Sequence, residues 1–104
     1  MTRDLKIAKE ARNLIARKGG WVRGDMKEEK VNGTFAYCAL GAIREAAKPA
    51  RGKRVATKLA DIIDPESWLS TSTITYFNDH IAKDKRYVLR KFDKLITQLK
   101  SNGK

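Results

Sequence analysis

The sequence predicts a mainly α-helical fold, with about four helices and a short β-hairpin between the first and the second. Three observations lead to this fold class. Apolar residues recur every three to four positions in stretches near both ends of the chain. An Asn-Gly pair, common in tight hairpin turns, lies between two short runs that contain aromatic and β-branched residues. Pro49 and Pro65 separate the apolar stretches that remain.

The first two elements are expected before residue 38. A helix over residues 3–18 has Thr2 as its N-cap and two glycines at its end. Its apolar positions follow helical spacing: Leu5, Ala8, Ala11, Leu14 and Ile15. Asn32-Gly33 then predicts a hairpin with a type I′ turn, between runs that hold Val31, Phe35 and Tyr37.

The uncharged stretch "TFAYCALGAI" raises the question of whether Cys38 is reactive or packed. The stretch predicts a central helix over Tyr37–Lys48 that ends before Pro49, and Gly41 in its middle indicates that another backbone comes close. A catalytic thiol needs a nearby base, and the single histidine, His80, is 42 positions away. We therefore expect Cys38 to be buried and poorly reactive.

Three further elements follow. "KPARGKR", residues 48–54, is expected to be a basic loop, followed by a short helix from Val55 to about Asp64 and a short helix among the aromatic and hydroxyl residues after Pro65. The last helix is expected over residues 85–100. The predicted core is Leu14, Ile15, Trp21, Leu40, Ile43, Leu59, Phe77, Leu89, Phe92 and Ile96.

Length and composition limit the class of protein. A chain of 104 residues with 41% hydrophobic residues predicts one small domain over residues 1–104. One cysteine cannot form an internal disulfide, and the charged N-terminus does not resemble a signal peptide. No apolar run approaches the roughly 18 residues that a membrane span needs. We expect a cytoplasmic protein with no membrane partner.

Several short motifs together resemble an uncharacterised family of small actinobacterial and bacteriophage proteins. They are "ARNLIARKGGW", "CALGAI", "NDH" and the final "VLRKFDKLI". Trp21 matches the family's Trp after the first helix, Cys38 to Ala42 match its Cys-Ala-Leu-Gly-Ala core, and Asn78-Asp79 match its Trp-Asn-Asp triplet, in which Phe77 replaces the Trp. The resemblance covers about residues 8–98. It implies a phage or bacterial origin, hence a bacterial host cell, and a mainly helical fold, but no activity.

No catalytic, cofactor-binding or metal-binding constellation is evident. Asn78, Asp79 and His80 are adjacent polar residues, but one His beside one Asp supplies only half of a metal site. Asn and Asp side chains more often cap or bridge loop backbone, which is the role we expect here. An enzyme is therefore not predicted, and no cofactor is expected.

The charge distribution points to nucleic acid as the partner. The net charge is +11, and residues 48–58 contain five basic residues and no acid. On the last helix, basic residues recur every four positions. Such clusters are typical of phosphate contact with DNA or RNA, with little sequence specificity. The predicted nucleic-acid-binding residues are Lys48, Arg51, Lys53, Arg54, Lys58, Arg86, Arg90 and Lys94.

Two alternatives use the same charges. A small phage protein can act by binding a host protein, and a basic surface would fit an acidic partner surface. Residues 59–82 hold four acids and no Lys or Arg, so this segment could instead pair with basic segments of a second copy and form a homodimer.

Overall fold

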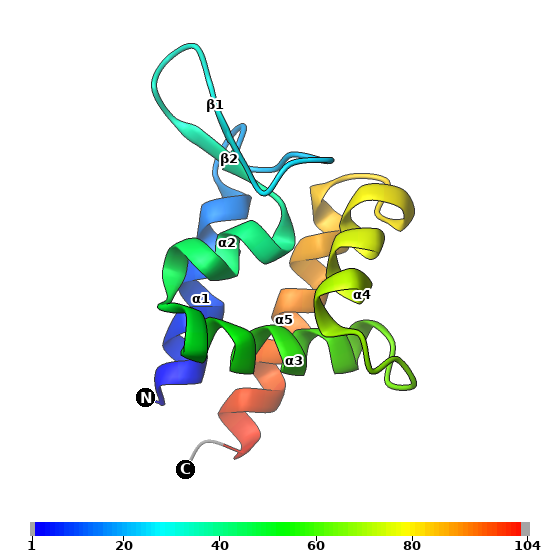
Figure 1. Ribbon diagram of the computed structural model, residues 1–104. Coiled ribbons are helices and arrows are strands. Elements are labelled where there is room, and N and C mark those ends of the chain that lie inside the picture. The colour runs from blue at the N-terminus through cyan, green and yellow to red at the C-terminus, as the bar shows by residue number, and fades with distance from the viewer. Residues whose placement is uncertain (1, 103–104) are drawn as a thin grey trace.

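The computed structural model describes residues 2–102 and is mainly helical. In chain order, the elements are α1 (Arg3–Ala16), β1 (Lys27–Glu29), β2 (Phe35–Tyr37), α2 (Ala39–Ala46), α3 (Pro49–Ile63), α4 (Ser70–Tyr76), the π-helix η1 (Phe77–Ile81) and α5 (Lys85–Asn102) (Figure 1). The predicted fold class is confirmed: an antiparallel hairpin lies between the first and second helices, and the described residues form five α-helices where about four were expected.

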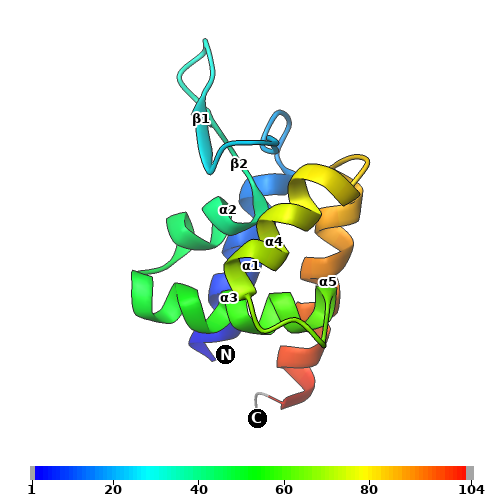
Figure 2. The ribbon, with the colours of Figure 1, turned by 45° about the vertical axis from the view of Figure 1, so that its right-hand side comes forward.

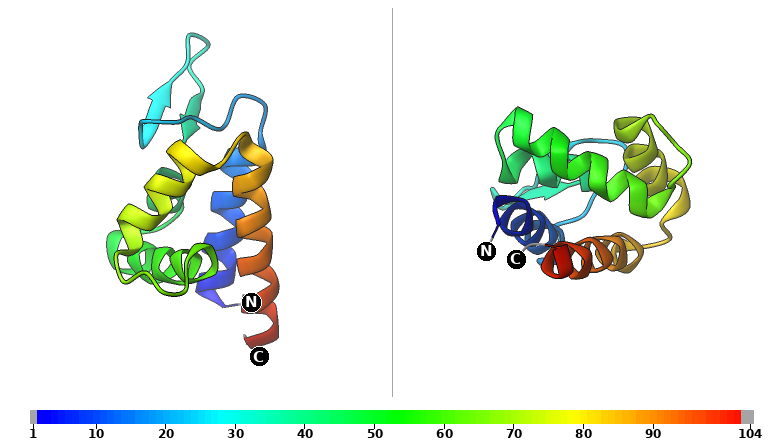
Figure 3. Two further views of the ribbon diagram at one scale, coloured as in Figure 1. Left: turned by 90° about the vertical axis from the view of Figure 1, so that its right-hand side faces the viewer. Right: turned by 90° about the horizontal axis from the view of Figure 1, so that it is seen from below.

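Each of the five α-helices packs against at least one other helix. α1 and α5 lie side by side and antiparallel, while α2 packs on α1, and α3 packs on α2, α4 and α5 (Figures 1 and 3). Seen from below, α1 and α5 are viewed nearly end-on, and α3 runs across beside this pair (Figure 3, right). The hairpin stands above the helices, at the end where α1 stops and α5 begins (Figure 2).

The predicted core is largely confirmed. Seven of the ten residues are buried: Ile15, Leu40, Ile43, Leu59, Phe77, Phe92 and Ile96. The other three, Leu14, Trp21 and Leu89, are partly buried and pack against this core. Phe92 and Leu95 of α5, together with Ile43 of α2 and Val55 of α3, are among the largest fully buried side chains, so the core lies where α1, α2, α3 and α5 meet.

The hairpin forms, but its turn differs from the predicted type I′. β1 ends and β2 begins at the Glu29–Phe35 pair, and the amide of Gly33 donates to the carbonyl of Lys30. A type I′ turn needs positive φ at both central residues, whereas only Gly33 has it, at 84°. The Asn32 side chain instead accepts from the amide of Thr34 at 3.1 Å. Asn32-Gly33 therefore closes a longer turn.

The central helix α2 is confirmed, but it begins later than expected. It spans Ala39–Ala46, and Cys38 is its N-cap, with the sulfur accepting from the amide of Gly41 at 3.3 Å. Gly41 faces the backbone of Met26, where a Cβ would lie 2.7 Å from the carbonyl carbon. The expected close approach of another backbone at Gly41 is confirmed, as is the burial of Cys38, which is 2% exposed.

The expected basic loop over residues 48–54 is wrong. These residues cap and begin α3, with Lys48 as the N-cap and Pro49 in the first turn. Proline favours this position because its fixed φ suits a helix and its missing N–H is not needed there. Gly52 does not make a turn; it is buried inside the helix against Ile43.

After α3 the chain turns and runs back through α4 and η1. The predicted short helix here is confirmed as these two consecutive segments. Trp68, in the connection before α4, is 87% exposed, and Tyr76 is 60% exposed. Trp68 therefore lies on the surface, whereas Trp21 packs against the core. The last helix, α5, runs two residues beyond its predicted end.

Candidate nucleic-acid interface

α3 presents basic side chains on two different faces. Arg51, Arg54 and Lys58 are spaced three and four residues apart and line a pocket of about 460 Å³ toward α1 and α5. Lys53 lines a separate groove toward α2 and α4. The basic residues that are close together in this part of the sequence therefore lie on two different faces of α3.

The pocket lies where the start of α1, residues 51–58 of α3 and the end of α5 meet. Among residues 2–102, its lining consists of Thr2, Arg3, Asp4, Arg51, Arg54, Lys58, Leu99 and Asn102. Four of these side chains are basic and one is acidic, so the lining carries a net charge of +3. We call Arg3, Arg51, Arg54 and Lys58 the basic cluster.

Asp4 organises the basic cluster. Its buried carboxylate accepts from Arg54 Nε at 3.1 Å and from Lys58 Nζ at 2.8 Å. Burial alone would raise the pKa of Asp4, but the hydrogen bonds and charges of Lys58 and Arg54 outweigh this effect and leave the pKa lowered. Asp4 therefore stays ionised near neutral pH and holds two basic side chains at the mouth of the pocket.

The basic cluster retains hydrogen-bond donors for a ligand. Arg54 donates to Asp4 through Nε, and its side chain is 66% exposed, which leaves its two terminal nitrogens as donors for a ligand. Within residues 2–102, Arg3 and Arg51 form no ion pair. A guanidinium presents a fork of donors that matches the oxygens of a phosphate. The arrangement can therefore bind a phosphate group through several directed contacts.

The predicted residues on α5 lie away from the basic cluster. Arg86 is in the first turn of α5, and Leu99, which lines the pocket, is thirteen residues later, about 20 Å along the helix axis. Arg90 stacks over the ring of Tyr87 at 5.5 Å, and Lys94 is exposed. Lys48 caps the start of α3 and is exposed.

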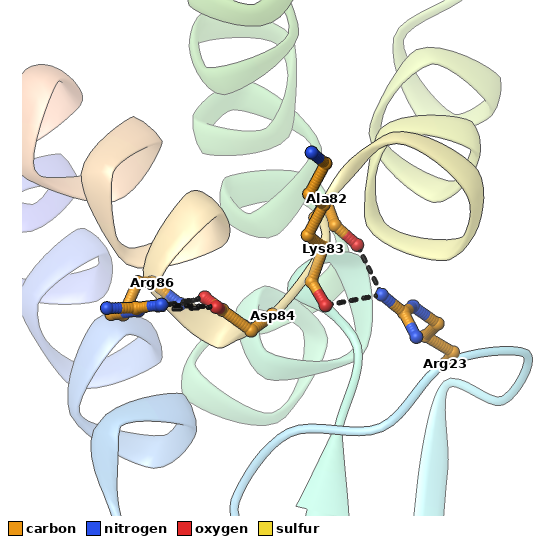
Figure 4. A network of polar contacts seen from close by, with 5 residues as sticks. All are labelled: Arg23, Ala82, Lys83, Asp84 and Arg86. Atoms are coloured by element: carbon orange, nitrogen blue, oxygen red, sulfur yellow. Dashed lines mark hydrogen bonds and ion pairs between the residues drawn. The ribbon is translucent and has the colours of Figure 1, made fainter.

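Arg86 is also engaged locally. Its guanidinium donates to both oxygens of Asp84 in the loop before α5 (Figure 4). The same loop accepts from Arg23 through the carbonyls of Ala82 and Lys83 (Figure 4). The Asp84 charge offsets that of Arg86, so this row contributes less to an anion site than its sequence indicates.

Two charged residues of the pocket, Arg3 and Asp4, were missed by the sequence reasoning. They belong to the first turn of α1, 47 or more positions before Arg51, and only the packing of α1 against α3 brings them together. The feature of the sequence that could have identified them is Asp4, an isolated acid among basic residues at the start of a helix. A buried acid of that kind usually has basic partners.

The motif residues Trp21, Ala39, Asn78 and Asp79 meet in a second polar centre. Asn78, fully buried in η1, accepts from Trp21 Nε1 at 2.7 Å and from the amide of Ala39 at 3.0 Å. Its amide nitrogen donates to the carbonyl of Val22 and to Asp79, and Asp79 accepts from the amide of Gly24. The expected role of these side chains, bridging loop backbone, is confirmed.

This second centre is saturated by its own contacts. Within residues 2–102, every buried side-chain nitrogen or oxygen has a hydrogen-bond partner, and no three His, Cys, Asp or Glu side chains are arranged to hold a metal. His80 is exposed and stacks at a tilt on Tyr76. Burial raises the pKa of Cys38, despite hydrogen bonds from nearby amides. The motif residues hold the fold together, and the basic cluster has the donors left for a ligand.

Comparison with known families assigns the chain to one family. Residues 1–98 match DUF6197, described as a family of unknown function, so the chain belongs to that family. Comparison with curated proteins and with solved structures found no match. Among residues 2–102, no helix is both long and apolar enough to cross a membrane.

Proposed function

We propose that this member of the DUF6197 family binds nucleic acid through phosphate contacts, with little preference for sequence. The observation that carries the proposal is the basic cluster: four basic side chains from α1 and α3 around one pocket, with a single buried carboxylate. We also propose that it does so in the cytoplasm of a bacterial host cell, where nucleic acid is present.

The chemistry of the pocket favours phosphate over bases. Its charged groups are guanidinium and ammonium donors, which bind phosphate oxygens. Its lining within residues 2–102 includes no aromatic side chain, so this part offers no surface on which a base could stack. Phosphate contacts position a protein on nucleic acid without reading its sequence. The net charge of +11 adds long-range attraction toward the polyanion.

The test is a salt titration of binding to random-sequence duplex DNA, single-stranded DNA and duplex RNA. If the four basic side chains each contact a phosphate, log K should fall with log salt at a slope of about −3 to −4 on duplex DNA. Arg3→Gln and Arg51→Gln should each weaken binding to all sequences alike and flatten the slope by about one unit. These two residues form no ion pair within residues 2–102, so their replacement should leave the melting temperature nearly unchanged.

The matched control is Lys18→Gln, which removes one exposed charge beyond the end of α1. It should leave the slope close to that of the unmodified protein. The triple variant Arg86→Gln, Arg90→Gln, Lys94→Gln measures the contribution of α5. If Lys18→Gln has the same effect as Arg51→Gln, binding is diffuse and the pocket is not the site. A protein without affinity for any of the three probes at low salt would refute the proposal and favour an acidic protein partner.

A further inference from the structure

An apolar groove lies on the other face of α3, opposite the basic cluster. It has a volume of about 550 Å³, and its floor and walls include the buried residues Leu40 of α2 and Ala56 of α3. The remaining lining residues are Arg44, Ala47, Pro49, Gly52, Lys53 and Thr71. Its charged lining residues, Arg44 and Lys53, are both basic, and neither forms an ion pair within residues 2–102. The groove therefore fits a segment in which an apolar side chain lies next to negatively charged side chains.

The same chain displays a segment of that chemistry. Three acids, Asp61, Asp64 and Glu66, lead along the end of α3 into the loop before α4, and two exposed apolar residues follow them. Trp68 is 87% exposed and Leu69 is 55% exposed. We call these five residues the acidic tip. An indole this exposed leaves one of the largest apolar side chains in water, which is typical of an interface residue.

The positions of the groove and the acidic tip allow two copies to bind each other in the same way. Thr71, in the first turn of α4, lines the groove and follows Trp68 by three residues, so the tip adjoins one wall of the groove. The loop that carries the tip lies at the outer end of α3, on the side away from the α1–α5 pair (Figure 3, right). A groove and a tip on neighbouring parts of one surface can engage those of a second copy reciprocally, which closes a two-fold dimer.

We propose that the chain forms a homodimer in which the acidic tip of each copy occupies the apolar groove of the other. Trp68 enters the groove, while Asp61 and Glu66 face Arg44 and Lys53 of the second copy. The attraction is local, because two copies with a net charge of +11 each repel one another at long range. The dimer should therefore form more readily at moderate salt than at low salt, unlike binding to phosphates.

The first measurement is sedimentation equilibrium across a range of protein concentrations, without nucleic acid. The protein should show a concentration-dependent monomer–dimer equilibrium. Trp68→Ala should weaken dimerisation by at least roughly tenfold, as expected for a central aromatic contact. Its helical circular dichroism should stay unchanged, because Trp68 packs on nothing in its own core. A protein that is monomeric at every concentration and salt would overturn the proposal.

Reversed charges test which surfaces meet. A groove variant, Arg44→Glu with Lys53→Glu, and a tip variant, Asp61→Lys with Glu66→Lys, should each be monomeric because like charges face each other in both contacts. An equimolar mixture of the two should dimerise, because both of its contacts pair opposite charges. The control Lys6→Glu, on exposed α1, should not change the equilibrium. A mixture that stays monomeric, while the unmodified protein dimerises, would show that the dimer uses other surfaces.

The dimer and the nucleic-acid proposal can fail separately. The groove and the basic cluster share no lining residue, since they lie on different faces of α3. Sedimentation without nucleic acid tests only the dimer, and a salt titration of the Trp68→Ala variant tests phosphate binding by the monomer.

Discussion

At the scale of single residues, Asn78 connects more of the fold than any charged side chain. Both of its polar atoms are used twice, and its partners come from the segment after α1, from the start of α2 and from Asp79 beside it. A buried side-chain amide that forms all of its hydrogen bonds stabilises the fold, whereas each buried partner left unpaired lowers the free energy of unfolding. The buried Asn78 thus fixes how α2 and η1 meet the loop around Trp21.

Asn78→Ala should lower the free energy of unfolding by about 2–4 kcal/mol, because it leaves the Trp21 indole, the Ala39 amide and the Val22 carbonyl without their partner. Urea unfolding at neutral pH measures the change. Asn13→Ala is the matched control: Asn13 is exposed on α1, and its loss should change stability by less than about 0.5 kcal/mol. Equal effects of the two variants would contradict the role assigned to Asn78.

At the scale of elements, the two helical glycines have opposite meanings. Gly41 sits in α2 where the chain before β1 crosses, and any side chain would meet the Met26 backbone. Gly52 sits in α3, where a Cβ would make ordinary contacts of 3.7–3.9 Å with Ile43 and Ala47. The glycine in α2 is required by packing, and the one in α3 only weakens its helix.

Alanine should therefore shift stability in opposite directions at these two positions. Gly41→Ala should be destabilising by about 1–3 kcal/mol, because the backbone of Met26 has to move. Gly52→Ala should be stabilising by about 0.5–1 kcal/mol, through better helix propensity and a stiffer unfolded chain. Thermal unfolding of both variants checks this. A loss of stability at Gly52 would show that α3 needs the space beside Ile43.

The elements also show what the sequence could and could not predict. Amphipathic spacing located α1 and α5, and the small residues of α2 indicated the close approach at Gly41. Pro49 was ambiguous, because a proline ends the helix before it and equally begins the helix after it. Gly52 among basic residues favoured a loop. In the folded protein, Gly52 and Val55 are buried against the other helices, and this packing stabilises α3 over its fifteen residues. Helix boundaries of this kind are decided by tertiary packing.

At the scale of the whole molecule, the charge pattern depends on which helix ends meet. The sequence placed Arg51, Arg54 and Lys58 in one basic segment but could not show that Arg3 and Asp4 join them. It also grouped Lys53 with them, although Lys53 lies one residue before Arg54, about 100° around the helix, and therefore lines the groove. Linear charge counts therefore located the basic segment, and packing selected which of its residues share a pocket.

Asp4 links stability and binding across the molecule, and its replacement should move them in opposite directions. Asp4→Asn weakens the contacts with Arg54 and Lys58, because a neutral amide oxygen is a poorer acceptor than a carboxylate, and it should lower the free energy of unfolding at pH 7 by about 1 kcal/mol, since both partners are partly exposed. It also removes the one negative charge of the pocket, so affinity for duplex DNA should rise under the proposed function. A variant that lost both stability and affinity would indicate that Asp4 mainly positions the basic cluster for its ligand.

The pH dependence gives an independent check on Asp4. Its pKa is lowered in the folded state, so the stability it contributes is complete above its usual pKa of 3.8 and is lost as pH falls through the lower folded value. In the unmodified protein, protonation at acid pH removes the carboxylate charge that Asn lacks at every pH. The stability difference between Asp4→Asn and the unmodified protein should therefore be constant from pH 7 to about pH 5 and shrink below pH 3.8. Urea unfolding at pH 7, 5 and 3 measures it, and a difference that persists unchanged at pH 3 would mean that the ionised carboxylate is not its source.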